Sequence, residues 1–528
     1  WFYDPKRTGA PKFVGYNAQF DLGFFQSLGI DMEFSDDAML LHYCLDERPQ
    51  QRSLENVTVD RLNAPRYEEG MLARYNTKKG SMWQDVPIDE IMMYCAKDCD
   101  WTLRLFLDLM EEAEQTPSIM QPYKKLLIPA IPVFKAIDDQ GLWVDRERHA
   151  ALMTQYKTKV EELEVLMKEI TGNPDFNPRS HPQVQEALWD DLMLQQPRLK
   201  KRKPRSADKA TREALLKKYP QQELVVALND YSKIYTYYSR YIRPLPQFFD
   251  KGDGRVRPNY HFDRTETGRL SATSPGIHQI PRDSDIRSMY GAPPRKVLVQ
   301  ADYSQLELRM AAHIARDSNM TAIVNRTDVD FHKLMASHAF KVPVEAVTPD
   351  QRQKSKPFTF GVLYFMGDAT LAQQSGLSIA DASEVATNYW AMMPDVKAWT
   401  ADIRRQVREN HYVKSIFGRR RRFPLITREN FDALHREAVN MPIQSSASDL
   451  TLYNVIRLHH RLQAKYPEAH IVIMVHDSII VECPLPIAEE VAALVRCTMT
   501  EDLPFNTDVR FPVEIKIGRH WGEGEVWA

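Results

Sequence analysis

The sequence predicts a multidomain protein that joins an α/β domain to a larger α+β region, and three observations lead to this prediction. A chain of 528 residues is too long for one hydrophobic core, because cores rarely grow beyond about 250 to 300 residues before the chain divides. Residues 1 to about 120 alternate short apolar runs with helical stretches, which is typical of an α/β domain. After Pro244, turns rich in glycine and proline separate short segments, which indicates strands and a new domain.

The first half of the chain contains two predicted helical regions. Residues 88–115 form a long amphipathic pattern that ends before Pro117, so we expect one long helix there. From Tyr123 to about Tyr241 the pattern is again long and helical, with a polar interruption around residues 172–182. This region predicts a helical arm.

Two predicted strand regions of the second half end in acidic residues. KVLVQADYS, residues 296–304, predicts a buried strand that leads into a helix over residues 305–317. IVIMVHDSIIVECP, residues 471–484, predicts two apolar strands that meet at the polar tip His476-Asp477-Ser478. The stretch between them is mostly helical, so Asp302 and Asp477 are distant in sequence but can be neighbours in one sheet.

Composition and charge limit the class of protein. With 43% hydrophobic and 27% charged residues and no apolar run near the ~20 residues of a membrane span, we expect a soluble protein of the cytoplasm and no membrane partner. The net charge of −2 argues against a protein coated in nucleic acid. Basic runs at residues 198–205 and 419–422 still allow a locally positive groove, although each run can equally be a solvated face.

A carboxylate at the end of a buried strand loses hydration unless it is paired or binds a cation. If Asp302 and Asp477 lie on adjacent strands, their oxygens form a site suited to magnesium. Two such ions stabilise the attacking and leaving oxygens of a phosphoryl displacement. The alternative is that each aspartate only caps its own turn.

A second constellation consists of Arg352, Lys356, Phe360 and Tyr364, which follow one another at intervals of four residues. This spacing predicts one helix face with two cations followed by two aromatic rings. Arginine and lysine bind triphosphate oxygens, and aromatic rings stack on bases. A solvated basic end followed by core aromatics remains the alternative.

These segments resemble the DNA polymerase I family, also called family A. DYSQLELR at residues 302–309 resembles its first polymerase motif, the pattern over residues 352–364 resembles its finger helix, and VHDS at residues 475–478 resembles its third motif, VHDE. TGRLS at residues 267–271 and GRRRRFP at residues 418–424 add to the resemblance. It covers roughly residues 123–528.

The resemblance implies a ribonuclease H-like exonuclease domain followed by a right-hand polymerase. The implied boundaries are an N-terminally incomplete 3′→5′ exonuclease-like domain at 1–122, the start of the polymerase domain with the helical thumb at 123–250, the first part of the palm at 251–330, the fingers at 331–430 and the second part of the palm at 431–528.

The resemblance also implies template-directed DNA synthesis from deoxynucleoside triphosphates on primer-template DNA, by a monomer that uses two Mg²⁺ ions. Asp302, Asp477 and the Tyr303 carbonyl would hold the ions. The implied nucleotide-binding residues are Arg352, Lys356, Phe360, Tyr364, Gln305, Tyr303 and Glu307; among them Lys356 is also a candidate general acid and Glu307 the steric gate against a ribose 2′-hydroxyl.

Five residues are implied to contact the primer, the template or the new base pair: Arg269, Arg436, Asn440, Gln444 and His476.

Two positions depart from the family pattern. Ser478 stands where the family usually has Glu, and Phe365 stands where Gly usually follows the finger tyrosine. The first departure removes a third carboxylate, and the second predicts altered packing after the finger helix.

In the N-terminal region, NAQFD at residues 17–21 resembles the second motif of the family's 3′→5′ exonuclease, and YCAKD at residues 94–98 resembles its third. Asp21, Tyr94 and Asp98 are therefore the candidate exonuclease residues. The first motif, Asp-x-Glu, does not occur before Asp21, and we expect it to lie before Trp1 in a longer protein. An exonuclease fold without an active site is the alternative.

Two rival functions follow from the same motifs. One is a catalytically silent homologue that grips primer-template DNA, and the intact set of Asp302, Asp477, Arg352 and Lys356 argues against it. The other is a single-subunit RNA polymerase, against which Glu307 argues. The features are compatible with a phage replicative enzyme or with a truncated bacterial one, acting in a bacterial cell or an infected host.

Overall fold

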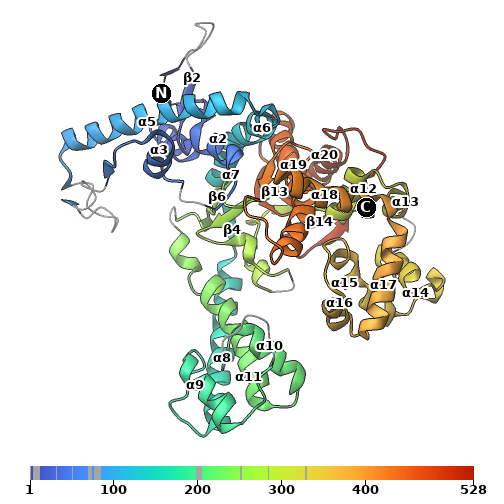
Figure 1. The fold of residues 1–528 in the computed structure, drawn as a ribbon. Helices are drawn as coiled ribbons and strands as arrows, with labels where there is room; N and C mark the ends of the chain where they lie inside the picture. Colours follow the sequence, from blue (N-terminus) through green and yellow to red (C-terminus); the bar gives the residue numbers. More distant parts are fainter. Residues whose placement is uncertain are drawn as a thin grey trace.

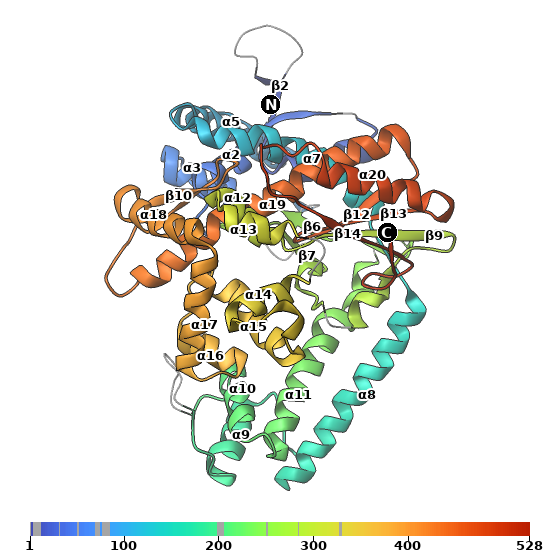
Figure 2. The same ribbon diagram turned by 90° about the vertical axis from the view of Figure 1, so that its right-hand side faces the viewer.

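The computed structural model describes residues 2–3, 12–30, 32–49, 52–68, 74–75, 85–197, 205–249, 252–282, 285–326 and 330–527. An N-terminal α/β unit adjoins a central sheet, and a helical arm and a second helical group extend from the sheet away from that unit (Figure 1, Figure 2). This arrangement confirms the expected combination of α/β and α+β parts. None of the helices in these ranges is long and apolar enough to cross a membrane.

The N-terminal unit is built on a small mixed sheet in the order β1-β2-β3. Strands β1 (Phe2–Tyr3) and β2 (Lys12–Gly15) are antiparallel, whereas β2 and β3 (Phe34–Asp37) are parallel and are connected through helix α1 (Ala18–Ser27). The other helices of this unit are α2 (Ala38–Leu45), α3 (Leu54–Leu62) and α5 (Ile88–Glu114). Helix α5 ends before Pro117, as the sequence predicts.

The helical arm consists of α8 (Arg146–Thr171) packed along α11 (Glu223–Tyr237), with α9 (His181–Glu186) and α10 (Lys209–Lys218) at its tip. Its buried side chains form a hydrophobic core of their own, which includes Met167, Leu188, Leu215 and Leu228. At the base of the arm, β4 (Leu142–Val144) pairs with β5 (Arg255–Val256) and β8 (Tyr290–Gly291).

The central sheet has the strand order β12-β13-β9-β14-β15, and every neighbouring pair is antiparallel. The strands are β9 (Lys296–Tyr303), β12 (His470–Val475), β13 (Ser478–Pro484), β14 (Val513–Gly518) and β15 (Glu525–Trp527). Helices α19 (Phe431–Lys465) and α20 (Ala488–Thr500) pack with it, and α12 (Leu306–Ala315) packs against α19. The two acidic strand ends predicted from sequence therefore belong to one sheet.

The second helical group contains α14 (Phe331–Phe340), α15 (Pro349–Gly361), α16 (Asp368–Ser375) and α17 (Ile379–Met392), and α18 (Pro394–Asn410) leads back to the sheet (Figure 1). A hairpin of β10 (Tyr412–Lys414) and β11 (Arg420–Arg422) follows.

The remaining elements connect these parts. Helix α7 (Ile128–Gln140) contacts both α1 and β12, and one continuous hydrophobic core extends from the N-terminal unit into the central sheet. The others are α6 (Pro117–Pro122), α13 (Ser318–Val324), β6 (Asn259–His261), β7 (Ser271–Thr273), the π-helical turns η3 (Tyr123–Leu127), η4 (Ala187–Asp191) and η5 (Tyr238–Ile242), and the 3₁₀ turns η6 (Leu245–Phe248), η7 (Ile277–Gln279), η8 (Asp285–Met289), η9 (Val344–Ala346) and η10 (Leu485–Ile487).

The buried histidine of α2 makes the stability of the N-terminal unit depend on pH. His42 is 5% exposed, and burial, together with the charges of Arg52 and Arg61, lowers its pKa to about 4. The unfolded chain, with a histidine pKa near 6.5, binds the proton more tightly. The stability that the neutral ring contributes is therefore present above pH 6.5 and is lost as the pH falls towards 4.

We expect the free energy of unfolding to fall by about 2 kcal/mol between pH 7 and pH 5 through this residue alone. Urea unfolding at the two pH values measures the change, and His42→Gln should reduce it. The matched control, His181→Gln at an exposed histidine, should leave it as in the parent. An equal pH dependence in all three proteins would contradict the assignment to His42.

Candidate active site

The pairing of two strands brings Asp302 and Asp477 together. Asp302 lies near the end of β9 and faces Ser478, the first residue of β13, in the antiparallel register. Asp477 precedes Ser478 in the tight turn between β12 and β13, where His476 adopts a left-handed conformation with φ of 56°. The Tyr303 amide also donates to the Asp477 carbonyl at 3.2 Å. The predicted proximity of the two carboxylates is therefore confirmed.

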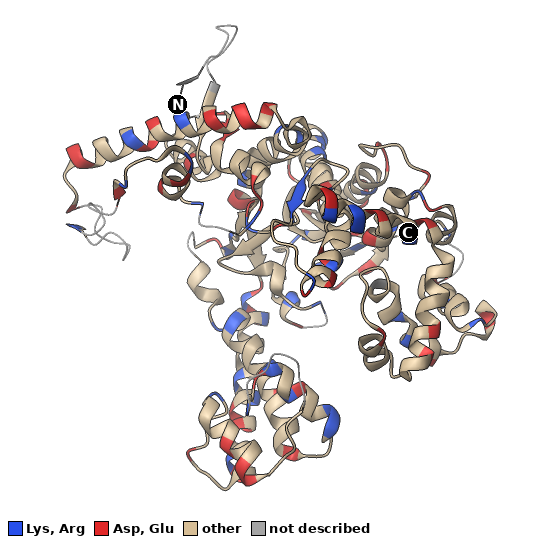
Figure 3. Cartoon of the chain, viewed as in Figure 1, with Lys and Arg blue, Asp and Glu red and all other residues tan. Residues whose placement is uncertain are grey.

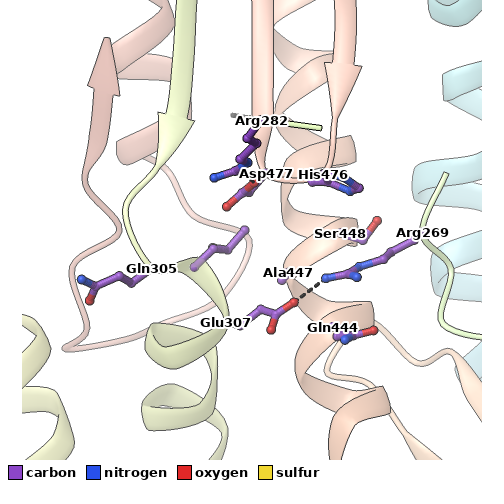
Figure 4. A pocket seen from close by; sticks show the side chains of 10 residues that line it. Arg269, Arg282, Gln305, Glu307, Gln444, Ala447, Ser448, His476 and Asp477 are labelled. Atoms are coloured by element: carbon purple, nitrogen blue, oxygen red, sulfur yellow. Dashed lines mark hydrogen bonds and ion pairs between the residues drawn. The ribbon is translucent and has the colours of Figure 1, made fainter. Parts of the chain in front are cut away.

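One guanidinium group contacts both carboxylates. Arg282 places one terminal nitrogen 2.9 Å from Asp477 Oδ1 (Figure 4). The other terminal nitrogen lies 3.6 Å from Asp302 Oδ2. It lies in the segment that follows η7. Sequence reasoning missed Arg282, because a single arginine in an irregular segment has no periodicity or motif that would connect it to residues 20 and 195 positions away.

The charge of this pair is only partly balanced. Burial, followed by the negative charge of Asp477, raises the pKa of Asp302 to about 7, and the charge of Arg282 opposes both effects. Oδ1 of Asp302 is buried and accepts no hydrogen bond from any described residue. A cation between the carboxylates would supply the missing partner and favour the ionised form of Asp302.

These residues fit a magnesium site that is completed by other ligands. The described part of the chain contains no group of three or more histidine, cysteine, aspartate or glutamate side chains placed to hold a metal ion. Magnesium keeps several waters and binds through one or two carboxylates plus substrate phosphates, so a pair of aspartates suffices from the protein side.

A cavity of about 290 Å³ lies in front of Asp477 (Figure 4). It combines residues from the loop before β7, the segment after η7, the start of α12, the middle of α19 and the β12–β13 turn. They are Arg269, Arg282, Gln305, Leu306, Glu307, Gln444, Ala447, Ser448, His476 and Asp477. Five of the residues that the resemblance implied for nucleotide or DNA binding, Arg269, Gln305, Glu307, Gln444 and His476, therefore share one cavity.

Glu307 is the centre of a hydrogen-bond network in this cavity. One carboxylate oxygen accepts from Arg269, and the other accepts from the Tyr364 hydroxyl at 2.5 Å. Burial, followed by the charge of Glu307, raises the pKa of Tyr364 well above its ordinary value, so its hydroxyl stays protonated and acts as a donor. The carboxylate is held from two sides, which fixes its position in the cavity.

The four residues spaced at intervals of four, Arg352, Lys356, Phe360 and Tyr364, are placed partly as predicted. Arg352 and Lys356 lie on α15, but this helix ends at Gly361, and the prediction that Tyr364 lies on it is wrong. Tyr364 lies in the turn that follows, where it reaches Glu307. Phe360 lies within α15, and its side chain is outside the described part of the structure.

Neither Arg352 nor Lys356 lines the cavity. Arg352 donates two hydrogen bonds to Asp330, at 3.0 and 2.8 Å, and this contact lowers the pKa of Asp330 to about 2. Lys356 is half-buried one turn further along α15. A triphosphate bound by Arg352 would therefore replace a carboxylate that already holds its guanidinium group.

Three predicted DNA-binding residues, Arg436, Asn440 and Gln444, follow one face of α19 at intervals of four residues. Arg436 is exposed, Oδ1 of Asn440 is buried without a hydrogen-bond partner among the described residues, and Gln444 lines the cavity. His476 lies across from them, and burial lowers its pKa to about 4, so its ring is neutral at pH 7. The face leads from the exposed end of α19 into the cavity.

The basic run at residues 419–422 forms neither an open groove nor a solvated face, which corrects both interpretations offered for it. Arg419 is buried and pairs with Asp449 at 2.9 Å, Arg421 pairs with Glu266 and Glu437, and Arg422 pairs with Glu47. Figure 3 shows basic and acidic residues interspersed over the molecule. Residues 198–204, most of the other basic run, lie outside the described ranges.

A second cavity, of about 780 Å³, lies in the N-terminal unit and contains all three candidate exonuclease residues. Asp21 projects from α1, and Tyr94 and Asp98 project from α5. The sequence reasoning missed two further residues at this place: Tyr67 donates to Asp98 at 2.7 Å, and Glu68 accepts from Tyr94 at 3.3 Å. Burial raises the pKa of Asp21 and of Asp98.

The family model of DNA polymerase family A matches residues 146–523, which is most of the chain. The chain belongs to DNA polymerase family A. A 3′-5′ exonuclease model matches residues 8–114. The family A match contains the helical arm, the second helical group and the central sheet with its two carboxylates, except for the edge strand β15.

Relatives in family A are similar over nearly the whole chain. DNA polymerase I of Pseudomonas aeruginosa is 30% identical over 534 residues, which covers 98% of this chain and 57% of the relative. The thermostable DNA polymerase I of Thermus aquaticus is 30% identical over 501 residues, which covers 93% of this chain and 56% of the relative. The chain therefore spans a little more than half the length of these curated relatives.

A solved structure shows the same fold. The POL domain of Pol1 from M. smegmatis, in complex with a DNA primer-template and dNTP, superposes with a TM-score of 0.85 at 24% sequence identity. The superposition covers 99% of this chain and 87% of that chain. The likeness confirms the fold of an exonuclease-like domain followed by a family A polymerase domain.

The two departures from the family A pattern have local structural roles. Ser478 donates from its hydroxyl to the Ala301 carbonyl at 3.0 Å, so it bonds across the strand pair instead of adding a carboxylate. Phe365 adopts a left-handed conformation with φ of 54°, and its ring packs against Trp390 and His435, with centroids 5.2 and 4.8 Å apart.

We expect Arg282→Leu to strengthen the binding of a divalent cation in the absence of DNA, because the guanidinium group has to leave the carboxylates when the cation enters. An exposed ion pair contributes at most about 1 kcal/mol, so the Kd of the divalent cation should fall about fivefold in the variant. Calorimetric titration with Mn²⁺ measures it, and Arg264→Leu, at an exposed arginine nearby, is the control. Unchanged affinity in Arg282→Leu would show that Arg282 does not compete with the cation.

Proposed function

We propose that this protein is a DNA-directed DNA polymerase that adds deoxynucleotides to the 3′ end of a primer. The observation that carries the proposal is the placement of Asp302 and Asp477 side by side at the edge of a cavity that also holds Glu307 and Arg269. The M. smegmatis protein of the same fold was solved with a DNA primer-template and dNTP, which supports the same partners here.

In the proposed mechanism Asp302, Asp477 and the Tyr303 carbonyl hold two magnesium ions. When bound, the ions supply charge stabilisation for the attacking primer hydroxyl and for the leaving pyrophosphate. Arg352 and Lys356 bind the triphosphate, and Lys356 donates a proton to the pyrophosphate as it leaves. Arg352 is already arranged as a bidentate donor, as its two bonds to Asp330 demonstrate.

Sugar selection is assigned to Glu307. Its carboxylate is fixed by Arg269 and Tyr364, so it cannot turn away from a ribose 2′-hydroxyl without breaking two hydrogen bonds. Gln305, whose Oε1 is buried and without a hydrogen-bond partner among the described residues, lies beside it as a further nucleotide ligand. Phe360 is assigned to stack on the new base pair.

Contacts with the primer-template are assigned to Arg269, Arg436, Asn440, Gln444 and His476. Their surroundings support geometric checking of the base pair, because Asn440 and Gln444 offer neutral donors and acceptors to the minor groove, where base pairs share acceptor positions. We further assign the protein to the cytoplasm of a bacterial or phage-infected cell, and we propose that it acts as a monomer.

A silent DNA-binding homologue is disfavoured by the same geometry. A protein that only grips DNA has no need for two neighbouring carboxylates in a place where burial, and then the charge of Asp477, raise the pKa of Asp302 to about 7. A single-subunit RNA polymerase is disfavoured by Glu307, because a gate fixed from two sides opposes ribonucleotides.

The second candidate activity is 3′→5′ exonucleolytic proofreading by the full-length protein. The supporting observation is the cavity that gathers Asp21, Tyr94 and Asp98. A labelled primer annealed to a DNA template tests it, because an active exonuclease shortens the primer in a reaction without nucleotides. An intact primer in that reaction would support an exonuclease fold without an active site.

Primer extension tests the main proposal directly. With a labelled primer, a DNA template, magnesium and four deoxynucleotides, the parent should extend the primer, whereas Asp302→Ala and Asp477→Ala should fall below about one thousandth of its rate, because each removes a ligand of the ions. Asp230→Ala, at an exposed carboxylate on α11, is the control and should extend normally. DNA binding, followed by fluorescence anisotropy, should persist in every variant.

Failure of the parent to extend the primer while it still binds DNA would overturn the polymerase proposal in favour of the silent homologue. Substantial extension by either aspartate variant would refute the assignment of that residue as an essential ligand.

Glu307→Ala should admit ribonucleotides, because the variant lacks the side chain that opposes the 2′-hydroxyl. We expect the preference for deoxynucleotides over ribonucleotides, expressed as the ratio of kcat/KM values, to fall at least about tenfold. The control is Glu345→Ala, at an exposed glutamate of the fingers, which should keep the parent's preference. An unchanged preference in Glu307→Ala would refute the assignment of Glu307 as the residue that excludes ribonucleotides.

A further inference from the structure

The exonuclease-like domain contacts the loop that carries Arg269. The hydroxyl of Tyr43, on α2, donates to the Thr265 carbonyl at 2.6 Å. The guanidinium group of Arg52 donates to the Asp263 carbonyl at 2.8 Å. Two side chains of the N-terminal domain therefore hold the backbone of residues 263–269, which we call the Arg269 loop.

The Arg269 loop also lies against a buried ion pair of the polymerase domain, whose Arg419 is 5.8 Å from the centroid of the Tyr43 ring. Arg419 and Asp449 are 6% and 0% exposed and lie 2.9 Å apart. The loop approaches this pair at Gly268, where φ is +78° and an added Cβ would lie 2.7 Å from Arg419 Nε. The loop therefore has no room to shift towards the pair, and the contacts from Tyr43 and Arg52 limit its movement in other directions.

Inside the Arg269 loop a second hydrogen bond continues towards the active site. The Thr265 hydroxyl donates to the Arg269 carbonyl at 2.6 Å. The Arg269 side chain then bonds to Glu307, which also accepts from Tyr364. A continuous series of contacts thus leads from Tyr43 in one domain to the proposed sugar gate in another.

The chemistry of Tyr43 suits a fixed donor. The side chain is 2% exposed, and burial raises its pKa to about 12, so the hydroxyl keeps its proton at neutral pH. Its ring lies beneath the Arg52 guanidinium, 5.2 Å from the centroid, which restricts the orientation of both groups. A side chain needed only to fill space between two domains would require no hydroxyl at this point.

We propose that Tyr43 is a positioning residue for the polymerase site: its hydrogen bond to Thr265 sets the Arg269 loop so that Arg269 holds Glu307 in the orientation that discriminates sugars. The inference rests on the proposed function of Glu307. It gives the exonuclease-like domain a role in nucleotide selection that is independent of any exonuclease chemistry.

The test compares three variants that remove single polar groups and keep the shape of the side chain. Tyr43→Phe removes the first bond of the series, and Thr265→Val removes the second while keeping the carbonyl that Tyr43 contacts. Tyr123→Phe is the matched control, because it removes a buried tyrosine hydroxyl that bonds to Asp36 at 2.9 Å, away from the Arg269 loop.

Two measurements are made on each protein. Hydrogen exchange of the peptide covering residues 263–269, without DNA or nucleotide, reports on the loop itself. The ratio of kcat/KM for a deoxynucleotide to that for the matching ribonucleotide reports on the gate. We expect Tyr43→Phe and Thr265→Val to accelerate exchange in this peptide and to lower the ratio about fivefold, the effect of one lost hydrogen bond.

The double variant Tyr43→Phe/Thr265→Val should lower the ratio no further than the stronger single variant, because both bonds act through the same loop. Tyr123→Phe should leave the ratio unchanged even if it lowers the melting temperature. Parallel losses of kcat/KM for both sugars in Tyr43→Phe, with an unchanged ratio, would reduce Tyr43 to a structural contact and overturn the inference.

The inference and the proposed function fail in different ways. If the parent does not extend primers, the polymerase proposal fails, whereas faster exchange of residues 263–269 in Tyr43→Phe still supports the link between the domains. If the parent extends primers and Tyr43→Phe leaves both exchange and sugar preference as in the parent, only the positioning role of Tyr43 is overturned.

Discussion

The structure depends on the antiparallel pairing of β9 with β13, because this pairing forces two carboxylates to share one place. The register that sets Asp302 opposite Ser478 is continued by six further residue pairs, down to Lys296 opposite Pro484. A slip of one residue would turn Asp302 to the opposite face of the sheet and separate it from Asp477. The apolar strands on both sides of the two carboxylates thus maintain an arrangement that burial and charge repulsion disfavour, and both effects raise the pKa of Asp302.

The basic residues that pair with these carboxylates lie on a different kind of segment from the acidic residues. Arg282 is the basic partner of both carboxylates, and Arg269 occupies a corresponding position beside Glu307. Each of these arginines comes from an irregular segment, whereas the acidic residues come from the end of a strand, from the tight turn between two paired strands and from the first turn of a helix. The acidic groups are therefore fixed by regular secondary structure or by the turn that it encloses, and the basic groups depend on loops whose positions other contacts must set. The contacts of Tyr43 and Arg52 with the Arg269 loop are one such case.

The sequence predicted best those site residues that lie on, or at the end of, regular secondary structure. The strands that end at Asp302 and Asp477, and the helix that carries Arg352 and Lys356, were predictable because their apolar or four-residue periodicity extends over many positions. The end of α15 before Tyr364 was not, because the turn that ends it depends on tertiary contacts such as the bond between Tyr364 and Glu307. Arg282 and Tyr43 were also missed, because each acts through a contact about 195 to 222 positions away that leaves no local pattern.

The separate hydrophobic core of the helical arm has a consequence for local stability. Met167, Leu188, Leu215 and Leu228 pack in the arm's own core, whereas Leu152 and Tyr156, nearer the start of α8, belong to the main core. The far part of the arm therefore forms a unit that can open locally while the main core stays folded. Sequence changes at the tip would alter the stability of that unit and leave the packing around the two carboxylates as it is.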